Sequence, residues 1–127
     1  KIIYTKVFVN DQDKALKFYT QILGFLKKSD IIAGITGGYL VSPEDQNGTE
    51  LILERNDNPA AKTYQKAIFE QSIPAANFGV SDVHIDYERL KKLGVKFTIE
   101  PSEVMENVTI AVFNDTCGNL IQIQTVG

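Results

Sequence analysis

Apolar residues follow a helical period shortly after the start of the chain. They recur every three or four positions, at Ala15, Phe18, Ile22 and Phe25. This spacing predicts an amphipathic helix. Asp11 or Asp13 can cap its N-terminus, and Gly24 can supply the left-handed residue that ends it. A second stretch with the same features predicts a helix over residues 83–93.

Alternating apolar and polar residues predict strands around these helices. The expected strands cover residues 2–9, 27–32, 34–41, 49–54, 75–80, 96–100, 108–114 and 120–126. A further helix is expected over 60–71, with Asn58 as N-cap and Pro59 in the first turn. Residues 101–107 are interpreted as a loop. The mixture of elements predicts an α+β fold.

Short motifs return later in the chain at nearly constant spacing. Val9-Asn10-Asp11 matches Val80-Ser81-Asp82 at a distance of 71 positions. Leu23-Gly24 matches Leu93-Gly94 at 70 positions, and the strand led by Gly48 matches the one led by Gly118 at 70. An internal duplication explains these ordered matches. We therefore predict one domain, 1–127, with two tandem β-α-β-β-β modules (1–56 and 73–127) joined by a connector helix within 57–72.

Composition narrows the classes of partner. The net charge is -3 and the 13 basic residues are scattered, so we expect neither nucleic acid nor an anionic membrane as partner. The single cysteine excludes an intrachain disulfide. The first residues, Lys1 to Tyr4, do not resemble the apolar region of a signal peptide. We therefore expect a cytoplasmic protein.

Two features together resemble a known family. One is the repeated unit of strand, Val-x-Asp, helix and Leu-Gly; the other is the final Asp115-x-x-Gly118-Asn119-Leu120-Ile121. This combination resembles the vicinal oxygen chelate superfamily, which includes glyoxalase I, bleomycin-resistance proteins and extradiol dioxygenases. The resemblance covers nearly all of the chain except residues 59–71. It implies a curled, mostly antiparallel sheet around a cavity, and it implies a homodimer.

The resemblance also implies where a metal would bind. Catalytic family members hold one divalent metal with His or Glu at four strand positions that face the cavity. The duplication places these positions at Tyr4, Ile52, Ala75 and Gln122. Alanine and isoleucine offer no ligand atom, and a neutral glutamine is a poor one. We therefore expect no metal cofactor.

Alternation predicts the lining of the cavity. The inward set is polar and aromatic: Tyr4, Lys6, Phe8, Glu50, Ile52, Glu54, Ala75, Asn77, Leu120, Gln122 and Gln124. The opposite faces are apolar and should cover the helices: Val7, Val9, Leu51, Leu53, Phe78, Val80, Ile121 and Ile123. Such an inward face suits a small molecule. Alternatively, these polar residues are only hydrated, or a partner covers them.

Individual residues leave several functions open. Tyr4 can donate a hydrogen bond to a ligand or pack into the vacated metal position. Glu50 and Glu54 are either acid–base or cation-binding groups or solvated strand-end charges. His84, the only histidine, is interpreted as a surface residue, and no base is visible for Cys117 as a nucleophile.

Three functional hypotheses follow. The first is a metal-free small-molecule-binding protein of the bleomycin-resistance type. The second is a divergent lyase, isomerase or dioxygenase-like enzyme that uses Tyr4, Glu50 or Gln122. The third is a structural dimer without a ligand. The connector helix carries a predicted apolar face of Ala61, Tyr64, Ala67 and Ile68, which we expect near a homodimer interface or the cavity entrance.

Overall fold

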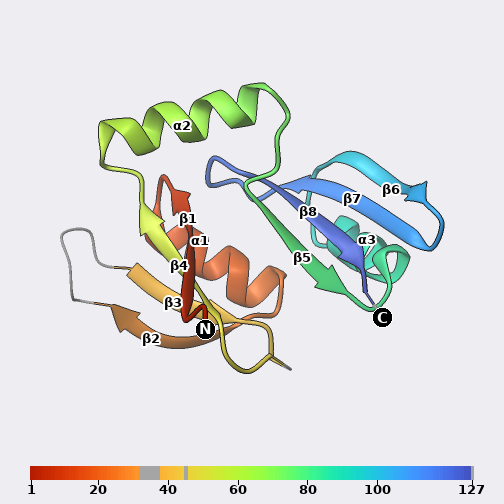
Figure 1. The fold of residues 1–127 in the computed structure, drawn as a ribbon, viewed down its shortest axis with the longest axis horizontal. Coiled ribbons are helices and arrows are strands. Elements are labelled where there is room, and N and C mark those ends of the chain that lie inside the picture. The colour runs from red at the N-terminus through yellow and green to blue at the C-terminus, as the bar shows by residue number, and fades with distance from the viewer. Residues whose placement is uncertain (32–37, 45, 127) are drawn as a thin grey trace. The chain divides into compact units, whose positions relative to one another are not determined.

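A computed structural model describes residues 1–31, 38–44 and 46–126 (Figure 1). The chain divides into two compact units, Lys1–Lys66 and Ala67–Gly127, and each is described by itself. Each unit carries a four-stranded sheet with one helical segment packed on it. The α+β class and the two tandem β-α-β-β-β modules are therefore confirmed.

The first unit begins with a strand and a helix. Its elements are β1 (Tyr4–Val9), α1 (Gln12–Lys17), the π-helix η1 (Phe18–Ile22), β2 (Leu26–Ile31), β3 (Gly38–Ser42) and β4 (Glu50–Arg55). The strand order is β1-β4-β3-β2. β1 and β4 are parallel, whereas the other two pairings are antiparallel. Of the strand expected over 34–41, residues 34–37 lie outside the described part of the chain.

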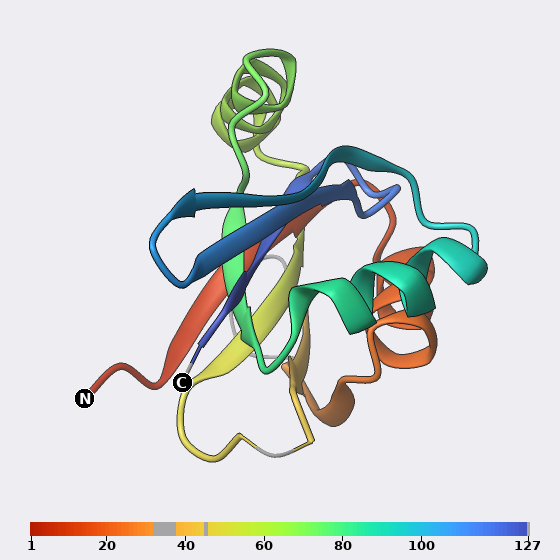
Figure 2. The ribbon, with the colours of Figure 1, turned by 90° about the vertical axis from the view of Figure 1, so that its right-hand side faces the viewer.

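The second unit repeats this order. Its elements are β5 (Ala76–Val80), α3 (Val83–Lys92), β6 (Phe97–Met105), β7 (Val108–Asn114) and β8 (Leu120–Thr125). The strand order β5-β8-β7-β6 matches that of the first unit, with β5 and β8 parallel. Figure 2 shows β6 and β7 as neighbouring antiparallel arrows.

The duplication extends to the helix caps. Asp11 has φ -150° and ψ 108°, and Asp82 has φ -149° and ψ 108°. The Asp11 carboxylate accepts from the Lys14 N–H at 3.0 Å, and that of Asp82 accepts from the His84 N–H at 2.9 Å. Each carboxylate satisfies a backbone donor that the helix itself leaves unpaired. Asp11, rather than Asp13, is therefore the N-cap of the first helix.

The helical segments differ by one residue. The motif spacing falls from 71 to 70 across them, so the first segment contains one residue more than the second. The structure places this residue in η1, where the Leu23 N–H donates to the Phe18 carbonyl at 3.1 Å. A π-helical turn accommodates one extra residue, so the cap before it and the glycine stop after it keep their conformations. Gly24 and Gly94 then end the two segments with φ +85° and +90°.

The helix-facing side of each sheet forms a core. α1 packs on β3 and β4, and α3 packs on β6, β7 and β8. Six of the predicted core residues are buried: Val7, Val9, Leu51, Leu53, Ile121 and Ile123. Phe78 and Val80, on the edge strand β5, are only half-buried. Burial of apolar area on one face of each sheet is the main stabilising contribution in each unit.

The expected loop over 101–107 is wrong for most of its length. β6 continues to Met105 and only the turn at 106–107 follows it. β6 is the edge strand of its sheet, and its register with β7 shifts between Ile99 and Ser102. Proline is tolerated at a sheet edge next to such an irregularity, because its missing N–H removes no ladder hydrogen bond. Pro101 therefore does not end the strand.

The connector helix α2 spans Pro59–Glu70, and the Asn58 side chain caps it by accepting from the Ala60 N–H at 2.8 Å. Its buried residues are Ala61 and Gln65. Gln65 donates to the Phe8 carbonyl at 2.8 Å and accepts from the Asn56 amide at 2.7 Å. Of the predicted apolar face, Ala61 is buried and Tyr64 is 59% exposed. Within the described residues, no helix is long and apolar enough to cross a membrane.

Candidate functional site

The inward face of the first unit is built by three neighbouring strands. Parallel pairing of β1 with β4 sets Tyr4 beside Glu50, Lys6 beside Ile52 and Phe8 beside Glu54. Antiparallel pairing then sets Leu40 of β3 beside Ile52. The six residues predicted from alternation in this unit share one face, because strand residues two apart point to the same side. Tyr4 is 50% exposed, whereas Leu40 is buried.

Lys6 is held in the middle of this face. Its Nζ lies 3.3 Å from Glu54 Oε2 and 6.0 Å from the centre of the Phe8 ring. The Glu54 side chain is only 18% exposed, so the ion pair is partly shielded from water. The result is a surface with an aromatic ring, a phenol and a neutralised charge pair. Such a surface can stack a planar group and donate hydrogen bonds to it.

The inward face of the second unit is uncharged. Asn77 of β5 lies beside Gln122 of β8, and Gly79 lies beside Gln124. The Asn77 amide donates to Gln124 Oε1 at 3.0 Å. Asn77 is exposed, and both glutamines are half-buried. Leu120, predicted on this face, is buried.

Alternation missed one contributor to this second face. Val126 follows β8 and is 56% exposed. A Cβ placed on Gly79 would lie 2.9 Å from Val126 Cγ1, so the valine side chain lies against the glycine. The sequence signal was available, because Val126 keeps the two-residue spacing from Gln122 and Gln124.

The four positions that the resemblance assigns to a metal lie on these strands or at their ends. Tyr4 begins β1, Ile52 is central in β4, Ala75 precedes β5 and Gln122 lies in β8. The Ala75 N–H donates to the Leu120 carbonyl at 2.8 Å, which extends the β5–β8 ladder. In the part of the chain that is described, no group of three or more His, Cys, Asp or Glu side chains could hold a metal ion.

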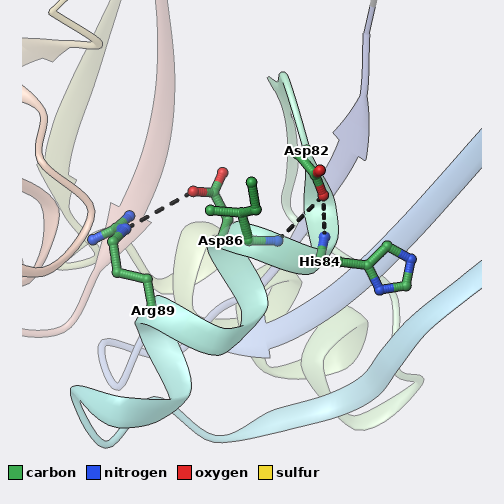
Figure 3. Close-up of polar contacts among 5 residues, drawn as sticks. Asp82, His84, Asp86 and Arg89 are labelled. Atoms are coloured by element: carbon green, nitrogen blue, oxygen red, sulfur yellow. Dashed lines mark hydrogen bonds and ion pairs between the residues drawn. The ribbon is translucent and has the colours of Figure 1, made fainter.

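His84 lies on α3, as the surface interpretation expects. It is exposed and borders an open depression of about 710 Å³ along this helix, lined by His84, Ile85, Glu88, Arg89, Lys92 and Leu93. Figure 3 shows the His84 ring pointing away from the ion pair of Asp86 and Arg89. In this pair, Arg89 Nε lies 3.8 Å from Asp86 Oδ1. Burial raises the pKa of the Asp86 carboxyl above its ordinary value, and Arg89 partly offsets this.

Cys117 has a structural position. It is buried in the turn before β8, and its N–H donates to Asp115 Oδ1 at 2.7 Å. The Asp115 carboxylate also accepts from the Asn119 N–H at 3.0 Å and from the Asn119 side chain at 2.8 Å. The final Asp-x-x-Gly-Asn motif therefore organises the turn that leads β8 into its sheet.

Comparison with known proteins identifies a family and several similar chains. The family described as Glyoxalase/Bleomycin resistance protein/Dioxygenase superfamily matches residues 1–123. YurT, an uncharacterized protein of Bacillus subtilis (strain 168), is 60% identical, and the match covers 97% of this chain and 97% of YurT. A probable lactoylglutathione lyase of Vibrio cholerae is 28% identical and is matched over 97% of this chain and 88% of its own length.

Solved structures resemble the whole chain as well. The crystal structure of TnmS3, an antibiotic binding protein from Streptomyces sp. CB03234, matches with a TM-score of 0.77 and 26% identity. The match covers 100% of this chain and 96% of TnmS3. The family match and the repeated sheet topology agree with each other. The chain belongs to the glyoxalase/bleomycin resistance protein/dioxygenase superfamily.

Proposed function

We propose that this protein binds a small, partly aromatic organic molecule on the inward face of the first unit, without a metal. The observation that carries the proposal is the set of Tyr4, Phe8 and the Lys6–Glu54 pair on a sheet whose other face is buried. Aromatic side chains combined with a few polar groups are typical of the lining of small-molecule sites. The likeness to TnmS3, which is described as antibiotic binding, supports this class of ligand.

Bleomycin, after which part of the family is named, is a suitable probe. Metal-free bleomycin is expected to bind the purified protein in isothermal titration calorimetry. Phe8→Ala removes the ring that lies beneath Lys6 and should weaken binding about fivefold, since one aromatic contact is worth about 1 kcal/mol. The matched control is Phe69→Ala, which removes a half-buried ring from α2. Equal affinities for the wild type and Phe8→Ala would contradict the site.

The metal-free part of the proposal rests on the donors available. Ile52 and Ala75 provide only hydrocarbon at two of the four family positions, and Glu50 and Glu54 stand about 13 Å apart along β4 at the usual strand rise. The titration is therefore repeated in EDTA, where bleomycin affinity should not change. The likeness to a probable lactoylglutathione lyase supports the alternative of an enzyme. Formation of lactoylglutathione from methylglyoxal and glutathione after Ni²⁺ or Zn²⁺ is added would favour it.

We also propose that the protein is a homodimer that uses α2. The support is Tyr64, a large side chain that is 59% exposed on an otherwise anchored helix. Sedimentation equilibrium at micromolar concentration should give twice the 14.1 kDa chain mass. Tyr64→Ala should shift this equilibrium toward monomer, whereas the exposed Lys62→Ala should not. A wild-type monomer at these concentrations would contradict the assembly.

A further inference from the structure

The two units carry the same cross-strand contact with different chemistry. In the first unit, Lys6 on β1 reaches Glu54, which lies two residues beyond its register partner Ile52. In the second unit, Asn77 on β5 reaches Gln124, two residues beyond its register partner Gln122. The duplication therefore retained the position of a donor and an acceptor. It exchanged an ion pair for a pair of amides.

An amide pair is uncharged, and each of its two side chains can both donate and accept. Each side-chain amide has a carbonyl acceptor and an NH₂ donor. The Asn77 amino group donates one hydrogen bond to Gln124 Oε1 at 3.0 Å. No hydrogen bond from another described residue is made to Asn77 Oδ1 or by the Gln124 amino group. Asn77 Oδ1 therefore remains as an acceptor and the Gln124 amino group as a donor, on side chains that are exposed and half-buried.

The surroundings of this pair are open and apolar. At the position where the first unit has Phe8, the second unit has Gly79, so β5 itself places no ring over the site. Val126 lies against Gly79 and is 56% exposed. Ile110 of β7 lies beside Gln124 in the register. A flat apolar body could rest on these side chains while its polar edge meets the two amides.

We propose that Asn77 and Gln124 form an amide clamp that binds the cis-amide edge of an uncharged lactam or imide ring. The ligand N–H donates to Asn77 Oδ1, and the ligand carbonyl accepts from the Gln124 amino group. This inference rests on the proposed small-molecule function and names the ligand class for the second unit. In the first unit the equivalent donor and acceptor are the charged Lys6 and Glu54, so a ligand edge there would have to compete with the ion pair.

A matched pair of probes tests the clamp on the full chain. 2-Pyridone carries the N–H and carbonyl edge, and N-methyl-2-pyridone has the same ring without the N–H. In ¹⁵N-labelled protein, 2-pyridone should shift the side-chain NH₂ resonances of Asn77 and Gln124 in a saturable way. N-methyl-2-pyridone should bind at least about tenfold more weakly, because it leaves a polar acceptor unpaired. Equal affinities for the two probes would overturn the clamp without any substitution.

A substitution adds a second readout. Gln124→Glu keeps the size of the side chain but replaces the outward donor with an acceptor, so 2-pyridone binding should be lost. The backbone amide spectrum reports whether this variant is folded. Phe8→Ala should leave 2-pyridone binding unchanged while it weakens bleomycin binding. If 2-pyridone binds Gln124→Glu as it binds wild type, the clamp is wrong; if only bleomycin fails to bind, the first-unit proposal alone is wrong.

Discussion

Asp115→Ala is expected to lower the free energy of unfolding by about 3–5 kcal/mol, because it leaves buried donors unpaired. The carboxylate is fully buried and accepts from the Cys117 N–H at 2.7 Å and from two Asn119 donors at 3.0 and 2.8 Å. The turn also holds Thr116 at φ 64°, a conformation that few non-glycine residues adopt. Without the carboxylate, these three donors lose the acceptor that they share.

Urea unfolding followed by circular dichroism measures this effect. Asp57→Ala is the matched control, because that carboxylate is 59% exposed and pairs with Arg55 at 3.2 Å. An exposed ion pair of this kind is worth less than about 1 kcal/mol. Asp115→Asn should fall between the two, since it keeps one carbonyl acceptor. A midpoint shift for Asp115→Ala no larger than that for Asp57→Ala would show that the turn does not depend on its carboxylate.

Tyr19→Ala is expected to cost about 3–5 kcal/mol, the usual cost of removing a buried aromatic side chain. Tyr19 is fully buried in η1, with its ring centre 5.5 Å from that of Phe18 and 6.0 Å from that of Phe25. The loss of the ring leaves a cavity beside the rings of Phe18 and Phe25. The same denaturant titration measures it.

Two further variants make this test specific. Gln21→Ala changes an exposed residue of the same π-helix and should have an effect within about 0.5 kcal/mol. Leu90→Ala changes the residue 71 positions after Tyr19, which is also buried, and should cost about 2–5 kcal/mol. If Tyr19→Ala were as mild as Gln21→Ala, the first helical segment would not depend on this ring for its packing.

Much of the fold follows from local patterns and their repetition. The Asp caps, the glycine stops and the alternation of Val7, Val9, Leu51 and Leu53 are each readable in the sequence. The spacing between repeated motifs drops from 71 to 70 positions, which indicates an extra residue in the first helical segment but not its position in that segment. A turn or a helix could absorb it, and only packing of Phe18 and Tyr19 selects the π-helix.

Two failures have a common cause. The sequence predicts a loop over residues 101–107, and its predicted apolar face of α2 does not include Gln65. In both cases a tertiary contact overrides a local preference. Pro101 lies on an edge strand, and Gln65 is buried because the Phe8 carbonyl and the Asn56 amide satisfy it. A search for apolar periodicity cannot find a buried glutamine.

The candidate site was predictable only in part. Alternation alone places Lys6, Glu54, Asn77 and Gln124 on inward faces. Which of them meet depends on the parallel register of β1 with β4 and of β5 with β8, and that register joins residues far apart in the chain. The close approach of Val126 to Gly79 likewise depends on three-dimensional placement.

The parallel pairing also has a consequence for how the chain folds during synthesis. Tyr4 pairs with Glu50, and Ala76 pairs with Ile121. The first strand of each unit can therefore pair only after the last strand of that unit has been synthesised. The antiparallel neighbours β2, β3 and β4 can associate earlier, because their contacts close shorter loops. Until β4 has left the ribosome, β1 has no partner, and the apolar side chains of Val7 and Val9 have no sheet to join. Slow translation through residues 10–49 should therefore prolong the interval in which a nascent chain needs a chaperone.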